Sequence, residues 1–148
     1  KVRGVAVGAG CNLALGCDLV VAADNARFSE IFVRRGLSLD FGGSWVLPRR
    51  IGMHRAKELA FFGEIIGASD AFEMGLVNRV LPENEIDQFV DEWASRLAAG
   101  PPIALAQTKR LLNNWTTEVK RFWHVVPTEV LGMLPNPLSD VEQESVRA

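Results

Sequence analysis

The sequence predicts an α/β fold in which strands and helices are mixed in the front part and helices fill the back. Two observations predict it. The apolar run Val2–Val7 ends at Gly8 and Gly10 and is followed by helix-like composition over Cys11–Gly16, which makes a strand–turn–helix unit. From Glu85 onward the apolar residues recur at the period of an amphipathic helix. The residues with this spacing are Ile86, Phe89, Val90, Trp93 and Leu97.

Short strands and turns are expected after the first helix. Leu19–Ala23 is apolar and β-branched, so it predicts a second strand, which Asp24–Asn25 closes as a turn pair. Ala26–Phe28 predicts a short third strand. Glu30–Arg35 fits a strand or a helix, and both stay open. Gly36–Gly43, with three glycines and an aspartate, predicts a loop.

The middle of the chain predicts three helical segments. Trp45–Ile51 predicts a helix that is broken near Pro48, because proline removes a backbone donor. Arg55–Phe62 predicts a second helix with one apolar side. Ser69 is a natural N-cap for a third, short helix that ends at Gly75.

The back of the chain predicts one more strand and then helices. Leu76–Leu81 is the expected strand, and Ile103–Leu112 is a helix that follows two prolines. Beyond Asn113 the signals weaken, although Ser139–Glu142 has the pattern of a capping box for a last short helix. The residues with helical spacing in this part are Val119, Phe122, Trp123 and Val126.

Composition and charge exclude several classes of protein. The chain has 148 residues, 48% of them hydrophobic, which suits a globular domain with a real core. Its formal net charge of -2 gives no basic surface for nucleic acid, and no apolar run reaches the roughly 20 residues of a membrane span. Cys11 and Cys17 are too few for a disulfide framework or a zinc site, so we expect no metal. We expect a cytoplasmic protein that binds a small molecule and, because the chain begins at Lys1, a piece of a longer protein.

The turn formed by Gly8, Ala9 and Gly10 allows three interpretations. A dinucleotide fingerprint would need a third glycine where Leu13 stands, so this interpretation fails. The turn could be structural, without a ligand. It could also expose backbone N–H groups at a helix N-terminus, where they would stabilise an oxyanion. The last two interpretations stay open on these residues alone.

Three longer segments resemble one known family. They are GAGCNLALGCDLVVAADNARF (Gly8–Phe28), GLSLDFGGSWVLPRRIG (Gly36–Gly52) and GEIIGASDAFEMGLVNRVLP (Gly63–Pro82). Together they resemble the crotonase, or enoyl-CoA hydratase/isomerase, family, and the similarity extends from about Val2 to about Asn113. The resemblance implies the C-terminal portion of a fold of stacked ββα units, followed by a helical region.

The resemblance also implies domains, substrate and partners. It divides the chain into a partial core over residues 1–82 and a helical region over residues 83–148 that is atypical after about residue 114. It implies an acyl-CoA enzyme without a cofactor, in which two backbone N–H groups hold the thioester oxygen of the coenzyme A substrate as an enolate. Ala9 matches the residue that gives one of these groups, with Gly8 and Gly10 beside it in the substrate site. The other group comes, in the family, from an earlier segment that this chain lacks. A homotrimer or hexamer is implied as well.

The hydratases of this family use two glutamates, and the resemblance places Asn12 and Phe32 at the matching positions. Asparagine does not exchange a proton near neutral pH, and phenylalanine has none to exchange. Both residues are therefore expected to line the substrate site without acting as acids. Glu30 lies close by but would point in a different direction, so it is a weaker candidate for the missing acid.

Asp40 is the stronger candidate for the acting carboxylate. It matches the position where the ring-degradation type of enoyl-CoA isomerase and the aryl-CoA dehalogenases carry their acting aspartate. One carboxylate can take a proton from one carbon and return it to another. We expect Phe32 and Phe41 to desolvate Asp40 in part and so to raise its pKa. The alternative is that Asp40 only starts the following turn or caps the helix at Trp45.

Two hypotheses from different classes remain for the chain as a whole. In the first it is the catalytic part of an acyl-CoA isomerase-like enzyme, with ordinary hydratase activity as the alternative chemistry. In the second it is a truncated member of the family that has no turnover and serves as an assembly partner. A basic cluster has two interpretations as well, as a binding surface for CoA phosphates or as a solvated face. The cluster consists of Arg49, Arg50, Arg55 and Lys57.

Overall fold

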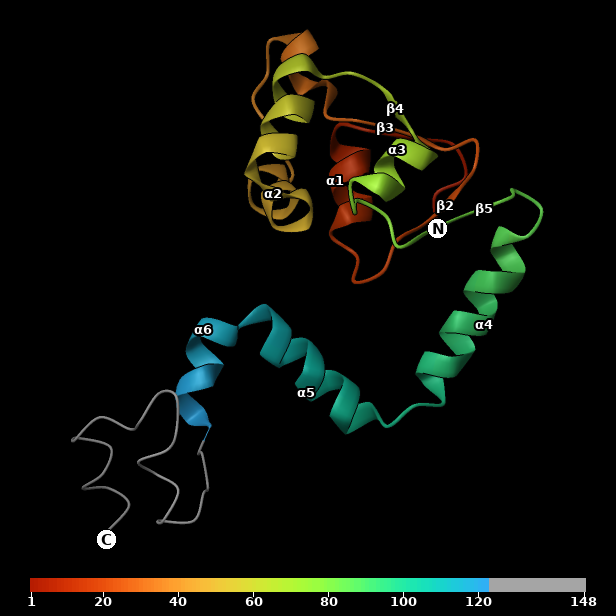
Figure 1. Ribbon diagram of the computed structural model, residues 1–148, viewed down its shortest axis with the longest axis vertical. Helices are drawn as coiled ribbons and strands as arrows, with labels where there is room; N and C mark the ends of the chain where they lie inside the picture. The colour runs from red at the N-terminus through yellow and green to blue at the C-terminus, as the bar shows by residue number, and fades with distance from the viewer. Residues whose placement is uncertain (123–148) are drawn as a thin grey trace, which may run out of the picture. The chain divides into compact units, whose positions relative to one another are not determined.

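The computed structural model describes residues 1–122, and Figure 1 shows its elements in chain order. The chain forms two compact units, residues 1–99 and residues 100–148. The predicted division after residue 82 stays a prediction.

Two small sheets form the β part of the first unit. The first has the order β1 (Val5–Val7), β3 (Arg27–Ser29) and β4 (Ile66–Gly67). In it β1 and β3 are parallel, whereas β3 and β4 are antiparallel. The second sheet pairs β2 (Val21–Ala23) with β5 (Arg79–Leu81) in parallel. The strand β3 is therefore the central strand of its sheet. The residues that directly follow it are attached to a backbone that pairs with β1 on one side and with β4 on the other.

The predicted strand Val2–Val7 is divided between these two sheets. Val2 forms a parallel bridge with Ala22 of β2 and donates its N–H to the carbonyl of Val21 at 2.9 Å. Three residues later, Val5 pairs with Arg27 of β3. One continuous strand was therefore the wrong prediction, because the apolar run changes sheets halfway along.

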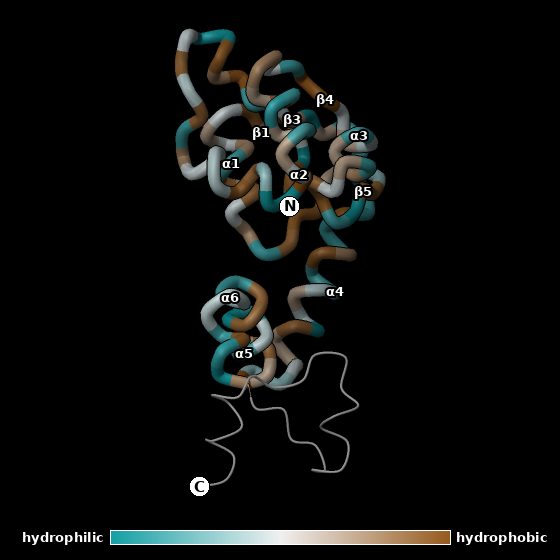
Figure 2. Tube along the Cα trace, turned by 60° about the vertical axis from the view of Figure 1, so that its left-hand side comes forward, coloured by the Kyte–Doolittle hydropathy of each residue, from teal (hydrophilic) through white to brown (hydrophobic). Residues whose placement is uncertain are grey.

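The first unit contains five helical segments. They are α1 (Ala9–Leu15), the 3₁₀ helix η1 (Ile31–Arg35), α2 (Gly43–Phe62), α3 (Ala68–Glu73) and α4 (Ile86–Ala98). The segment that fitted a strand or a helix is thus helical, and the predicted loop precedes α2 as expected. The core lies between α1, α2 and the sheets, and the brown segments of Figure 2 mark the apolar residues of the chain. Large members of this core are Leu15, Phe28, Leu47 and Leu59.

The helix α2 is broken at Gly52, not near Pro48 as the sequence predicted. Gly52 has φ 77° and ψ 164°, which lie outside the helical region, whereas Pro48 remains inside the helix. The fixed φ of proline is compatible with a helix, although its ring removes one hydrogen bond and crowds the carbonyl four residues earlier. A positive φ interrupts the helix, and glycine adopts it readily because it has no Cβ.

The helix α3 begins two residues earlier than predicted. Its N-cap is Gly67 rather than Ser69, and Ser69 lies within its first turn. A carboxylate oxygen of Asp70 accepts a hydrogen bond from the Gly67 N–H at 3.4 Å. An acidic residue in the first turn of a helix is favourable, and here Asp70 takes part in closing the helix start itself.

The helix α4 confirms the predicted amphipathic pattern over its first turns only. Ile86 is fully buried against Val21 and Ala23 of β2, and Phe89 and Trp93 pack at the edge of that cluster. Leu97 shares the predicted apolar spacing but is exposed, because the packing against β2 involves the N-terminal part of the helix.

The described part of the second unit is helical. It contains α5 (Pro102–Asn113), α6 (Trp115–Glu118) and the 3₁₀ helix η2 (Val119–Arg121). The helical spacing predicted beyond Asn113 ends at Phe122, where the backbone becomes extended. Trp123, Val126 and the capping box at Ser139–Glu142 lie outside the described residues. Within residues 1–122, no helix is long and apolar enough to cross a membrane.

Candidate functional site

The glycine turn lies between β1 and α1. Gly8 has φ 55° and ψ -125°, and its N–H donates to the carbonyl of Ser29 at 2.8 Å. A side chain at Gly8 would meet only ordinary contacts, so the positive φ is what requires glycine there. Ala9 and Gly10 are exposed, and Ala9 is the first residue of α1. Its N–H therefore has no carbonyl partner one turn earlier within the helix.

Asn12 lies on α1 and is buried, with 2% of its surface exposed. Its Nδ2 donates to the backbone carbonyl of Asp40 at 2.9 Å and to the carboxylate Oε2 of Glu30 at 3.2 Å. The same amide packs against Gly43, where a Cβ would stand 2.4 Å from Nδ2. Asn12 thus joins the end of β3 to the loop and the helix start that follow it.

Asp40 lies in the loop that precedes α2. Its Oδ1 accepts a hydrogen bond from the N–H of Phe41 at 2.6 Å, and its carbonyl accepts one from the N–H of Gly43 at 3.0 Å. These bonds confirm the predicted turn, but the N-cap of α2 is Gly42, so Asp40 does not cap this helix. Asp40 also lines a small cavity of about 170 Å³ together with Phe32, which is only 9% exposed, and Leu37, Ser38 and Leu39.

The expected desolvation of Asp40 is wrong for this chain. The Asp40 side chain is exposed, and Phe41, which was expected to shield it, is 55% exposed. Phe41 has a positive φ of 52° within a surface loop, so the two residues share a turn rather than a pocket.

Glu30 is the site residue that sequence reasoning undervalued. It follows β3 and is only 1% exposed. Burial raises the pKa of its carboxyl, although hydrogen bonds from Cys11 and Asn12 act in the opposite direction. Burial, together with the nearby Glu30 carboxyl, raises the pKa of the Cys11 thiol too. The available signal was a lone acidic residue between the apolar residues Phe28 and Ile31, which is where an inward-facing carboxyl would stand.

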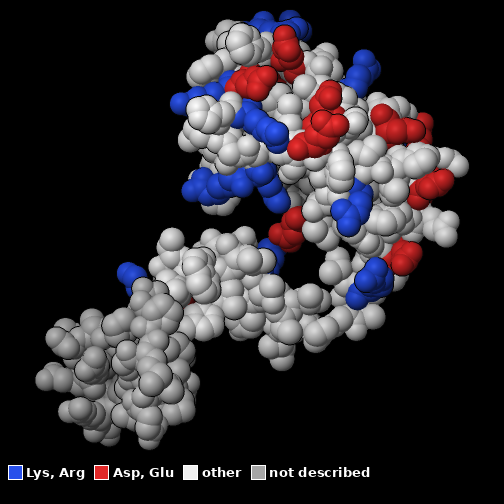
Figure 3. Space-filling view, viewed as in Figure 1, with Lys and Arg blue, Asp and Glu red and all other residues white. Residues whose placement is uncertain are grey.

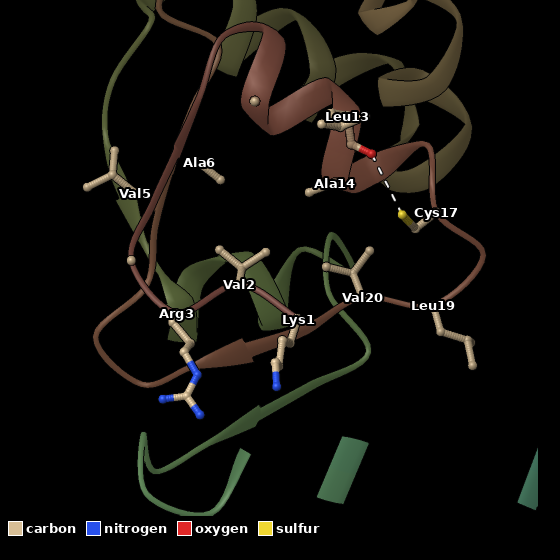
Figure 4. Close-up of a pocket in the computed structure, with 12 residues that line it drawn as sticks. Lys1, Val2, Arg3, Val5, Ala6, Leu13, Ala14, Cys17, Leu19 and Val20 are labelled. Atoms are coloured by element: carbon tan, nitrogen blue, oxygen red, sulfur yellow. Dashed lines mark hydrogen bonds between the residues drawn. The ribbon is translucent and has the colours of Figure 1, made fainter. Parts of the chain in front are cut away.

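A larger cavity of about 390 Å³ lies beside the glycine turn (Figure 4). Figure 4 shows Val2, Arg3 and Val20 on one side of it and the α1 residues Leu13 and Ala14 on the other. It shares Gly10 with the turn, but none of its lining residues belongs to the Asp40 cavity. Apart from Lys1 and Arg3 at its rim, it offers no ionisable group except the Cys17 thiol.

The three arginines of α2 contact the protein's own chain. Figure 3 shows Lys and Arg side chains grouped over the region of this helix. Arg49 stacks on Trp45 with 4.1 Å from its Cζ to the ring centroid. Arg50 donates to the carbonyl of Cys17 at 2.7 Å, and Arg55 donates to the carbonyl of Glu73 at 3.2 Å. Within residues 1–122, no cluster of three or more His, Cys, Asp or Glu side chains could hold a metal ion.

Comparison with known proteins identifies relatives for most of the chain. The family model described as enoyl-CoA hydratase/isomerase matches residues 1–126. A Rhodobacter capsulatus protein named "Probable enoyl-CoA hydratase" is 46% identical over 109 residues, which cover 74% of this chain and 42% of the relative. The 1,2-epoxyphenylacetyl-CoA isomerase of Escherichia coli is 40% identical over 116 residues, which cover 78% of this chain and 44% of the relative.

The fold agrees with these sequence matches. A solved structure of a Thermobifida fusca relative in complex with CoA superposes with a TM-score of 0.72 at 34% identity, over 81% of this chain and 45% of that chain. The chain thus spans less than half the length of each of these relatives. The predicted crotonase-like fold is confirmed, and the chain belongs to the enoyl-CoA hydratase/isomerase family.

Proposed function

We propose that the whole protein is an acyl-CoA isomerase, in which Asp40 moves a proton between two carbons of the substrate and thereby shifts a double bond. One observation carries the proposal. Asp40 is the only ionisable residue among those that line its cavity, whereas Asn12 and Phe32 occupy the positions that the resemblance assigns to the two hydratase glutamates.

The chemistry needs one carboxylate and a site for negative charge. When the carboxylate of Asp40 takes the proton, the electron pair moves onto the thioester oxygen and gives an enolate. The enolate then takes the proton back at another carbon, so substrate and product have the same atoms. Hydrogen-bond donors that face such an oxyanion each contribute about 3 kcal/mol in the transition state. The N–H of Ala9 is proposed as one of them, because it begins α1 and lies in an exposed turn.

The proposed substrate is an acyl-CoA thioester, and no further cofactor is needed. The proposal is supported by the CoA held in the Thermobifida fusca relative and by the isomerase activity named for the Escherichia coli relative. Small residues at Gly8, Ala9 and Gly10 would let the thioester approach the main chain, and Phe32 would supply an apolar wall beside Asp40. Asn12 is buried, so it would act from the protein interior rather than at this surface.

The Asp40→Asn variant of the whole protein tests this proposal. General acid–base catalysis contributes about 10²- to 10⁴-fold, so kcat for double-bond isomerisation should fall by about that factor while acyl-CoA binding changes little. Asp24→Asn is a matched control, because Asp24 is also an exposed aspartate in a turn but does not line the cavity. An Asp40→Asn variant that isomerises at the wild-type rate would refute the assignment.

Hydration of an enoyl-CoA is the second candidate function. The names of several relatives favour it, and the buried Glu30 offers a carboxyl with a raised pKa near Asn12. The two reactions are distinguished by their products, because hydration adds water and isomerisation leaves the mass unchanged. Mass spectrometry of the product from an enoyl-CoA therefore decides between them. If calorimetry detects no acyl-CoA binding at all, the protein is a non-catalytic member of the family instead.

The assembly and location of the protein complete the proposal. The family resemblance supports a homotrimer or hexamer, and the small-molecule substrate suits the cytoplasm. Light scattering during size-exclusion chromatography measures the number of subunits directly. A monomer at micromolar concentration would contradict the proposed assembly.

A further inference from the structure

The buried carboxyl of Glu30 belongs to no step of the proposed reaction, yet it is connected to Asp40 through a single side chain. We propose that Glu30 is a positioning residue: it orients the Asn12 amide, and that amide fixes the backbone of the loop that carries Asp40. This inference rests on the function proposed above and adds a residue to it that acts without touching the substrate.

The hydrogen-bond partners of Asn12 determine the orientation of its amide. Its two partners, the carboxylate of Glu30 and the carbonyl of Asp40, are both hydrogen-bond acceptors. Only the NH₂ end of the amide can donate, and it has two hydrogens. Rotating the amide by half a turn would put its oxygen against both acceptors. Asn12 therefore has one acceptable orientation, and both of its donors are used.

Glu30 is held in place by the backbone around it. It follows β3, the central strand of the three-stranded sheet, which pairs with β1 on one side and β4 on the other. Ser29, the residue before it, donates its hydroxyl to the carbonyl of Gly63 at 3.0 Å. A Cβ on Gly63 would stand 3.3 Å from the carbonyl of Glu30, so the end of α2 packs closely here. The carboxyl is thus attached to a backbone that is held by the sheet and by the end of α2.

The loop that carries Asp40 has few constraints of its own. Gly36 and Gly42, on either side of Asp40, both have positive φ, and the loop between them is largely exposed. The carbonyl of Asp40 accepts two hydrogen bonds, one from Gly43 at the start of α2 and one from Asn12. Asn12 is the side chain that connects this loop to the core. Without it the Asp40 carbonyl would keep only its hydrogen bond from Gly43 at the start of α2.

Gly43 shows that the sequence leaves space for this connection. Gly43 is helical, so its backbone does not require glycine, but a Cβ there would stand 2.4 Å from Nδ2 and 2.8 Å from Cγ of Asn12. A contact below 3 Å forces the amide to move. The absence of a side chain at Gly43 is explained by the presence of the Asn12 amide, and this contact provides an independent way to disturb it.

The charge on Glu30 bears on the strength of the connection. Two buried acceptors, Oε1 of Glu30 and Oδ1 of Asn12, have no hydrogen-bond partner. A proton on the carboxyl would turn one of these acceptors into a donor and lower the cost of burying both. Burial does raise the pKa of Glu30, and the titratable side chain that acts on it is the Cys11 thiol of α1. A neutral amide at position 30 should therefore serve nearly as well as the carboxyl.

The experiment measures kcat and KM for isomerisation in Glu30→Leu, Glu30→Gln and Glu58→Leu variants of the whole protein. Displacing a catalytic group by about 1 Å can cost about 100-fold in rate, so Glu30→Leu should lower kcat by about 10- to 100-fold and leave KM within about two-fold. Glu30→Gln should recover most of kcat, because its amide oxygen still accepts from Asn12. Glu58→Leu, at an exposed position of α2, should match the wild type.

Two further variants keep the inference testable if Glu30→Leu does not fold. Gly43→Ala should displace the Asn12 amide without changing Glu30, and it should also lower kcat more than it raises KM. Asn12→Leu combined with Glu30→Gln should be no slower than Asn12→Leu alone, because both changes act through one contact. A Glu30→Leu or Gly43→Ala variant that keeps wild-type kcat would overturn the inference. If these variants are slow but Asp40→Asn is fully active, the function proposed for Asp40 fails instead.

Discussion

Glu30 and Asp40 are carboxyl residues joined to the same asparagine, but one lies inside the protein and the other lies at its surface. Glu30 follows a central strand, is 1% exposed and keeps one oxygen without a partner. Asp40 lies in an exposed loop and binds the next backbone N–H through its side chain. The comparison indicates that a carboxyl in a fixed, dry position is suited to holding structure. A carboxyl on an exposed loop beside a cavity is suited to reaching a substrate.

The largest stability difference is expected between Glu30→Ala and Asp40→Ala. Removing Glu30 leaves a buried donor of Asn12 without its acceptor and deletes buried methylene groups, so the free energy of unfolding should fall by about 2 to 4 kcal/mol. Asp40→Ala changes an exposed side chain, and it should cost no more than about 0.5 kcal/mol. Urea denaturation measures both values. Glu58→Ala is the control for a simple loss of an exposed carboxyl, and equal losses for Glu30 and Asp40 would remove the basis of the comparison.

A smaller effect is expected at two helical glycines. Gly43→Ala forces a Cβ into the Asn12 amide, and overpacking of this kind costs about 1 to 3 kcal/mol of stability. Alanine regains up to about 1 kcal/mol of this, because its helix propensity is higher than that of glycine. Gly10→Ala is the matched control, because a Cβ there would have no heavy atom within 4 Å. Thermal unfolding should show a lower Tm for Gly43→Ala and an unchanged or higher Tm for Gly10→Ala. A stabilising Gly43→Ala would mean that the amide moves away without cost.

The sequence predicted the parts of the site that depend on local backbone chemistry. Gly8 and the short helix after it follow from a glycine pair behind an apolar run, and the loop at Asp40 follows from its glycines. The amphipathic period also predicted the position of α4. The mixed α/β fold was correct for the same reason, since each element has its own local pattern.

The sequence could not predict contacts between residues that are distant along the chain. Asn12 and Glu30 are 18 residues apart, and Asn12 and Asp40 are 28 apart, so no local pattern marks their hydrogen bonds. The same limit explains why Asp40 was expected to be shielded by Phe41, although adjacent residues in a tight turn rarely cover each other. It also explains the break of α2 at Gly52, where the φ of a glycine depends on what the next segment packs against.

The smallest effect is the pH dependence of stability that the buried carboxyl adds. The pKa of Glu30 is raised by burial in the folded state, so the folded protein holds this proton more tightly than the unfolded chain does. Its contribution to stability is complete below the ordinary pKa of 4.5 and is lost as the pH rises through the raised value. Glu30→Gln has no proton to lose there. The free energy of unfolding of Glu30→Gln should therefore rise relative to that of the wild type as the pH rises. The change in this difference per pH unit should not exceed the value for the loss of one proton.

Two other groups bear on how this measurement is made. The Cys11 thiol also has a raised pKa, but its ordinary value is 9.0, so titrations kept below that pH avoid it. Asp87, whose pKa is lowered by Lys1 and then by Arg3, is present in both proteins and cancels in their difference. Urea denaturation of the wild type and of Glu30→Gln at matched pH values gives that difference directly. If the two curves stay parallel from acid to neutral pH, Glu30 does not change its protonation on unfolding, and the contrast between the buried and the exposed carboxyl must be explained by geometry alone.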